Sequence, residues 1–170
     1  MRNESFAIKN LLNKFKTLDE LIELLGDFGS RDKTIVYTNG CFDLLHVAHV
    51  ELLERANYLG DLLIVGLSSD SSINRTKGLS RPIICEKDRV QIVSAVDCVD
   101  YVGIYQEDTP CEMIARLKPD IHVKGSDYNP EDYSNMPEAE VVRGYGGRVE
   151  IIDTILKKST SEIIRRIRVY

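Results

Sequence analysis

The sequence predicts an α/β fold in which helices cover both faces of a doubly wound parallel sheet within a single domain. The length of 170 residues fits one domain of ordinary size. Short apolar runs rich in Ile, Val and Tyr alternate with segments of helical periodicity from Thr34 to the C-terminus. Strands that alternate with helices form parallel sheets through right-handed crossovers, so helices are expected on both faces.

The chain divides into a helical lead-in, residues 1–33, and a main domain, residues 34–170. In the lead-in, Thr17 and Glu20 have the spacing of a capping box, which predicts a helix through Leu25. Glycines that follow would end this helix.

Each element of the main domain follows from a local pattern. The β-branched and aromatic runs predict strands at 34–38, 62–67, 101–104, 121–124 and 148–152. Apolar periodicity and start signals predict helices at 46–60, 86–96 and 110–117, with a final helix from Ser159. Residues 77–81 read as a basic, glycine-containing loop.

The composition excludes several classes of function. A formal net charge of -5 argues against sequence-independent nucleic-acid binding. No apolar run approaches the roughly 20 residues of a membrane span, and the N-terminus lacks a signal-peptide pattern. These observations favour a cytoplasmic protein that binds neither nucleic acid nor membrane.

The four cysteines show neither metal-ligand nor disulfide-framework spacing. Buried free thiols are expected at Cys41, Cys85, Cys98 and Cys111.

The richest segment for chemistry is 38–49, where a strand ends, Gly40 permits a tight turn and a helix begins near His46. Free backbone N–H groups at a helix N-terminus bind anions. His46 and His49 are three apart, so both rings face one side of the helix and can contact the same phosphate. Satisfied structural histidines and a metal site are the alternatives, but no third ligand stands at useful spacing.

Three further places offer phosphate contacts. Lys77 and Arg81 flank a glycine, as a mobile clamp would, although basic surface loops are also common. Lys124 ends a strand at the edge of the sheet where ligands bind. Ser159 and Glu162 have capping-box spacing, which is a sufficient structural reason for Ser159.

At this level of detail the chain resembles a known family. GCFDLLHVAH resembles the G-x-F-D-x-x-H-x-G-H signature of the cytidylyltransferase-like nucleotidyltransferases, whose fold is Rossmann-like. INRTKGLSRPI, EKDRVQIVSAV, LKPDIHVKGSDY and KKSTSEII resemble later family segments, so the likeness covers most of the chain. KGLSRPI, EDTP and VKGSDY look most like the stand-alone D-glycero-β-D-manno-heptose 1-phosphate adenylyltransferases.

The resemblance implies transfer of AMP from ATP to a heptose 1-phosphate with release of pyrophosphate, in nucleotide-activated heptose synthesis. Mg²⁺ would accompany ATP and sit mainly on the triphosphate, without a full set of protein ligands. A homodimer is also implied. The implied catalytic residues are His46, His49 and Lys77; the nucleotide contacts are Gly40, Cys41, Phe42, His46, His49, Lys124, Gly125, Asp127, Ser159, Thr160 and Ser161; the substrate contacts are Asp43 and Arg81.

One position departs from the family pattern, because Ala48 stands where the signature has glycine. Its methyl group would narrow the space in which the nucleotide approaches the helix backbone, while stabilising the helix by about 1 kcal/mol. Two alternatives stay open: another enzyme of the superfamily, such as a glycerol-3-phosphate cytidylyltransferase, and a catalytically silent nucleotide-binding module, which Ala48 is the only feature to favour.

Overall fold

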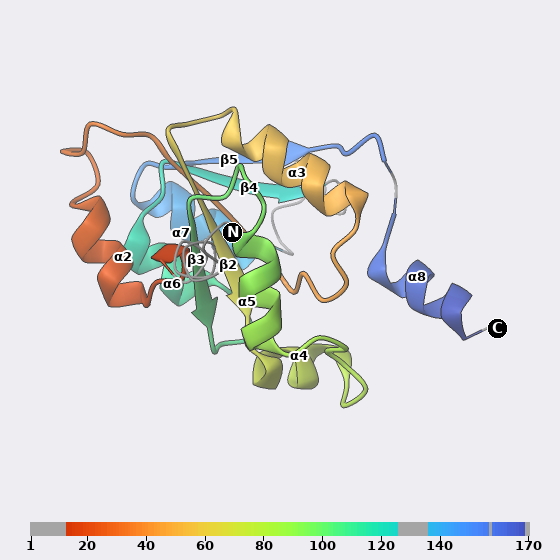
Figure 1. Ribbon diagram of the computed structural model, residues 1–170. Helices are drawn as coiled ribbons and strands as arrows, with labels where there is room; N and C mark the ends of the chain where they lie inside the picture. Colours follow the sequence, from red (N-terminus) through yellow and green to blue (C-terminus); the bar gives the residue numbers. More distant parts are fainter. Residues whose placement is uncertain (1–12, 126–135, 157, 169–170) are drawn as a thin grey trace, which may run out of the picture.

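The computed structural model describes residues 13–125, 136–156 and 158–168 and contains a five-stranded parallel sheet (Figure 1). The strand order is β3-β2-β1-β4-β5, so β1 lies at the centre with β2 on one side and β4 on the other. The strands are β1 (Ile35–Gly40), β2 (Leu62–Ser68), β3 (Tyr101–Tyr105), β4 (Ile121–Gly125) and β5 (Arg148–Ile152).

Helices pack on both faces of this sheet, as the sequence predicts. One apolar core cluster joins the sheet to α3 and α5, and a second joins its other face to α2, α6 and α7. Figure 1 shows α8 standing apart from the sheet near the C-terminus. The helices are α2 (Leu18–Leu25), α3 (Val47–Asn57), α4 (Asp70–Lys77), α5 (Glu86–Ser94), α6 (Cys111–Leu117), α7 (Pro137–Gly144) and α8 (Thr160–Ile167).

Two paired glycines make room for large side chains in the second cluster. Gly66 of β2 lies opposite Gly103 of β3. A Cβ at Gly66 would lie 2.0 Å from the hydroxyl of Tyr37, and one at Gly103 would lie 2.4 Å from Cε of Met113. A larger residue at Gly66 would displace the Tyr37 ring, and one at Gly103 would force the flexible end of Met113 to shift.

The sequence-based elements are confirmed with small changes at their ends. The capping box of Thr17 and Glu20 is formed, and α2 buries Leu21 and Leu25. All five strands are present. Two helices were not predicted, α4 and α7. Lys77, the first residue of the predicted basic loop, is the last residue of α4, so only residues 78–81 of that loop lie outside a helix.

The cysteine prediction needs one correction. All four residues are free thiols, but Cys85 is exposed and the other three are half-buried. Cys85 is the N-cap of α5, at the surface where the preceding loop enters the helix. No helix of the described residues has the length and apolar character to cross a membrane.

The parallel order brings four strand ends to one edge of the sheet. Gly40, Ser68, Tyr105 and Gly125 are the last residues of β1, β2, β3 and β4. The chain builds outward from β1 through β2 to β3, then crosses back from β3 to β4 on the other side of β1, so the strand order reverses at β1 and this edge is the expected place for a ligand.

Candidate active site

The turn between β1 and α3 has an unusual backbone. Phe42 adopts a φ of 46°, a left-handed conformation that non-glycine residues rarely take. Its ring lies against Gly40, where a Cβ would come within 3.1 Å of Cε2. Outliers of this kind cost on the order of 1–3 kcal/mol and cluster at functional sites. The turn places His46 as the N-cap of α3.

The two histidines form a stack at this helix N-terminus. Their ring centroids are 3.7 Å apart with an interplanar angle of 15°, and the Phe42 ring packs on His49 at 5.0 Å. The backbone N–H of His46 donates to Nδ1 of His49 over 3.4 Å. A neutral His49 ring therefore carries its proton on Nε2.

Burial favours the neutral form of both imidazoles. Burial, the neighbouring His46 ring and the Lys77 charge lower the pKa of His49 to about 4. Burial also lowers the pKa of His46. The stack therefore offers hydrogen-bond donors to a phosphate without adding positive charge in the free protein.

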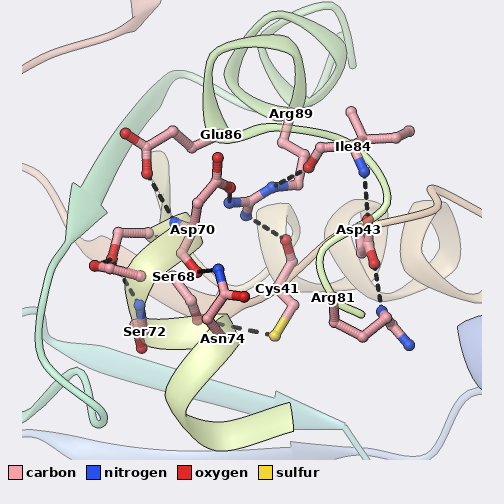
Figure 2. A network of polar contacts seen from close by, with 12 residues as sticks. Cys41, Asp43, Ser68, Asp70, Ser72, Asn74, Arg81, Ile84, Glu86 and Arg89 are labelled. Carbon is pink, nitrogen blue, oxygen red and sulfur yellow. Dashed lines mark hydrogen bonds and ion pairs between the residues drawn. The ribbon is translucent and has the colours of Figure 1, made fainter. Parts of the chain in front are cut away.

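A fully buried arginine fastens the motif turn to its surroundings (Figure 2). The guanidinium of Arg89 donates to the carbonyl of Cys41 at 2.7 Å and to that of Ile84 at 3.0 Å. It also pairs with Asp70, the first residue of α4, at 2.8 Å. The Arg89 guanidinium thus links three segments that are distant in the sequence: the turn after β1, the start of α4 and the loop before α5.

Asp43 plays a similar part at the other end of the turn (Figure 2). Its carboxylate accepts from the N–H groups of Ile83 and Ile84, both at 2.8 Å, and from Nε of Arg81 at 2.6 Å. Burial would raise the pKa of Asp43, but these donors outweigh it and lower the pKa. The side chain is fully buried and lines neither hollow described below, so the structure places it in the scaffold of the site.

Two adjoining hollows open beside the histidine stack. The first, about 440 Å³, lies over the ends of β1 and β4 and is lined in part by Gly40, Cys41 and Phe42. The second, about 640 Å³, lies between the N-termini of α3 and α8. Residues that line both hollows are His49, Leu52, Lys77 and Gly125.

The first hollow has a polar floor. Lys124 forms an ion pair with Glu138 at 2.5 Å and donates to Oδ1 of Asn39 at 3.2 Å. Asn39 donates to the hydroxyl of Tyr105 at 3.3 Å, and that hydroxyl lies 2.6 Å from Oγ of Ser68. These side chains come from five different elements and meet at the sheet edge.

The second hollow holds the predicted phosphate residues of the last helix. Ser159 is the N-cap of α8 and accepts from the backbone N–H of Glu162 at 3.1 Å, which forms half of the predicted capping box. Ser159, Thr160 and Ser161 line this hollow together with His46, Ala48 and Arg81. Asp127, predicted to contact nucleotide, lies outside the described residues.

Sequence reasoning missed several residues of this site. Glu138 follows Pro137, and a proline at the first helical position with acidic residues after it is a start signal for α7. Asn39 is the next-to-last residue of β1 and Tyr105 is the last residue of β3, so the strand-end rule that pointed to Lys124 also applies to them. Arg89 lies in a helix of weak amphipathicity, and no local signal marks its burial.

The described part of the chain holds no group of three or more His, Cys, Asp or Glu side chains placed to bind a metal ion. His49 and Lys77, which line both hollows, instead offer nitrogen donors. Mg²⁺ prefers oxygen ligands, whereas such donors suit phosphate oxygens.

Comparison with known proteins gives consistent results. The sequence profile of a family described as Cytidylyltransferase-like matches residues 37–166. Bifunctional protein HldE of Syntrophotalea carbinolica is 51% identical over 155 residues, which cover 91% of this chain and 31% of that protein. HldE of Campylobacter concisus is 45% identical over 166 residues, which cover 98% and 33%. The chain therefore spans about a third of the length of these curated relatives.

Solved structures show the same architecture. A lipopolysaccharide core biosynthesis protein from Thermoplasma volcanium superposes with a TM-score of 0.59 at 28% identity, covering 74% of this chain and 99% of that one. Pantoate-beta-alanine ligase from Francisella tularensis superposes with a TM-score of 0.60 at 13% identity, covering 86% and 68%, and this second likeness concerns the fold alone.

Proposed function

Since the chain belongs to the cytidylyltransferase-like family, we propose that it transfers AMP from ATP to a heptose 1-phosphate and releases pyrophosphate. The acceptor's phosphate oxygen forms a bond to the α-phosphorus while the bond from that phosphorus to the bridging oxygen of pyrophosphate breaks. The observation that carries this proposal is the wall shared by the two hollows, where His49 and Lys77 face both sides. A donor on one side and an acceptor on the other would meet there.

In this arrangement the second hollow receives the triphosphate. The N-terminus of α8, with Ser159, Thr160 and Ser161, supplies hydroxyl and backbone N–H donors. Arg81, whose Nε pairs with Asp43, lines the same hollow and can donate its remaining N–H groups to a phosphate. The backbone from Gly40 to Phe42 contributes donors from the first hollow.

Catalysis then rests on positioning and on stabilising negative charge in the transition state. A sugar phosphate is mostly dianionic at pH 7, because its second pKa is roughly 6, so no general base is required. His46 and His49 donate hydrogen bonds to the α-phosphate, and Lys77 provides the cation beside them. Mg²⁺ carried by the triphosphate would supply further charge neutralisation.

The choice of a heptose phosphate rests on two kinds of likeness. The segments KGLSRPI, EDTP and VKGSDY resemble heptose 1-phosphate adenylyltransferases. The Thermoplasma volcanium protein, 28% identical, is described as a lipopolysaccharide core biosynthesis protein. Both point to an activated sugar of cell-surface glycans as the product.

The test is pyrophosphate release with Mg²⁺ across ATP, CTP, GTP and UTP, each paired with a panel of sugar phosphates and glycerol 3-phosphate. ATP with a heptose 1-phosphate should give the highest kcat/KM. A clear preference for CTP with glycerol 3-phosphate would refute the substrate assignment. Nucleotide binding without turnover on any acceptor would identify a silent binding module instead.

A further inference from the structure

The floor of the first hollow contains an uninterrupted chain of polar contacts that nucleotide transfer alone does not require. Glu138 contacts Lys124, Lys124 contacts Asn39, Asn39 contacts Tyr105, and Tyr105 contacts Ser68. Lys124 and Glu138 are only 5% and 4% exposed, yet both line the hollow. A buried ion pair of this kind is weak evidence for stability, so its place at the sheet edge suggests a role toward a ligand.

The charges and donors of this floor indicate what kind of group it would bind. The Glu138 carboxylate balances the Lys124 ammonium, so the pair adds no net charge for a phosphate. A carboxylate accepts hydrogen bonds, an ammonium donates them, and the amide and hydroxyls of Asn39, Tyr105 and Ser68 do both. Each hydroxyl of a sugar also donates and accepts, so such a floor matches a polyhydroxylated ligand.

The opposite end of the same hollow has different chemistry. His49 and Lys77 lie there, at the wall shared with the second hollow. The hollow therefore has a neutral, hydrogen-bonding floor and a phosphate-binding end. Its volume of about 440 Å³ falls within the usual range of small-molecule pockets, roughly 300–1,000 Å³.

We propose that Glu138 and Lys124 are specificity-determining residues, which bind hydroxyl groups of the sugar acceptor in the first hollow while its phosphate points to His49 and Lys77. The inference rests on the proposed function, whose acceptor is a sugar phosphate. It moves Lys124 from the nucleotide side, where the sequence resemblance places it, to the acceptor side. Glu138 has no role in that resemblance.

The principal test replaces both members of the pair, Lys124→Met with Glu138→Met, because removal of one partner would leave a buried charge unpaired. With saturating ATP, KM for the heptose 1-phosphate should rise about 10- to 100-fold, the scale for lost hydrogen bonds to charged groups. The Kd for ATP, measured by calorimetry without acceptor, should stay within about twofold. A second variant, Tyr105→Phe, removes one hydroxyl of the floor without a change of charge and should also raise the acceptor KM.

A matched control addresses the structural role of such a pair. Asp120→Asn weakens the partly buried pair with Arg31 at the opposite edge of the sheet, and it should lower stability without changing either substrate constant. An unchanged acceptor KM in both floor variants would refute the inference while leaving the proposed function intact. Weaker ATP binding with an unchanged acceptor KM would return Lys124 to the nucleotide side. If the wild-type protein turned over none of the sugar phosphates, the proposed function and this inference would both be refuted.

Discussion

Replacement of His49 by alanine tests the proposed mechanism most directly. Nδ1 of His49 accepts from the His46 backbone, so Nε2 is the atom that would donate to the reacting phosphate. Loss of one transition-state donor costs about 2.7–4 kcal/mol, which corresponds to a fall in kcat of about 10²- to 10³-fold. The folded state loses one long hydrogen bond and two ring contacts, with His46 and Phe42, at about 1 kcal/mol.

The assay is pyrophosphate release at pH 7.5 with both substrates saturating, accompanied by thermal melts. Leu52→Ala is the matched control, because Leu52 lines the same two hollows but offers no donor. Its kcat should fall much less than that of His49→Ala. If the His49 variant keeps a kcat within about threefold of wild type while remaining folded, His49 does not stabilise the transition state and the mechanism fails.

Three further changes have measurable outcomes. Ala48→Gly should leave kcat similar, tighten ATP binding by about 1 kcal/mol or less and lower stability by about 1 kcal/mol. Weaker ATP binding would contradict the idea that the Ala48 methyl group narrows the space for the nucleotide. Asp43→Asn should cost about 2–4 kcal/mol in urea unfolding, whereas Asp108→Asn, at an exposed pair, should change stability by less than about 1 kcal/mol. Burial on β4, then the Lys124 charge, lowers the pKa of His122 to about 3. The unfolded chain therefore takes up a proton at His122 below about pH 6.5 while the folded chain does not, and this residue alone should cost about 2 kcal/mol of stability between pH 7 and 5. His122→Leu should therefore lose about 2 kcal/mol less than wild type over this range.

The parts of the fold that the sequence predicts are those with strong local patterns. The five strands carry β-branched runs, and Thr17 with Glu20 forms the capping box as expected. The histidine pair was predictable because a spacing of three on a helix fixes the relative position of two side chains. Its stacking at 3.7 Å follows from that spacing.

The remaining features depend on contacts between distant segments. In α4, Ile73 is the only large apolar residue, and the helix is capped by Ser69 and held by Glu86, whose carboxylate accepts from the N–H of Asp70. Arg89 meets the Cys41 carbonyl 48 positions away. Such partners are set by tertiary packing, so local propensity and periodicity cannot identify them.

In the proposed mechanism, the neutral imidazole of His49 and the cation of Lys77 have different roles. The Lys77 cation would meet the charge that ATP already carries in the ground state, so it would attract both substrate and transition state. A neutral imidazole donates a hydrogen bond that strengthens as negative charge grows on the oxygens of the α-phosphate and the leaving group. Only interactions that are stronger in the transition state raise kcat. Burial of His49, which lowers its pKa to about 4, would thus reserve its contribution for the reacting state and leave ground-state attraction to Lys77.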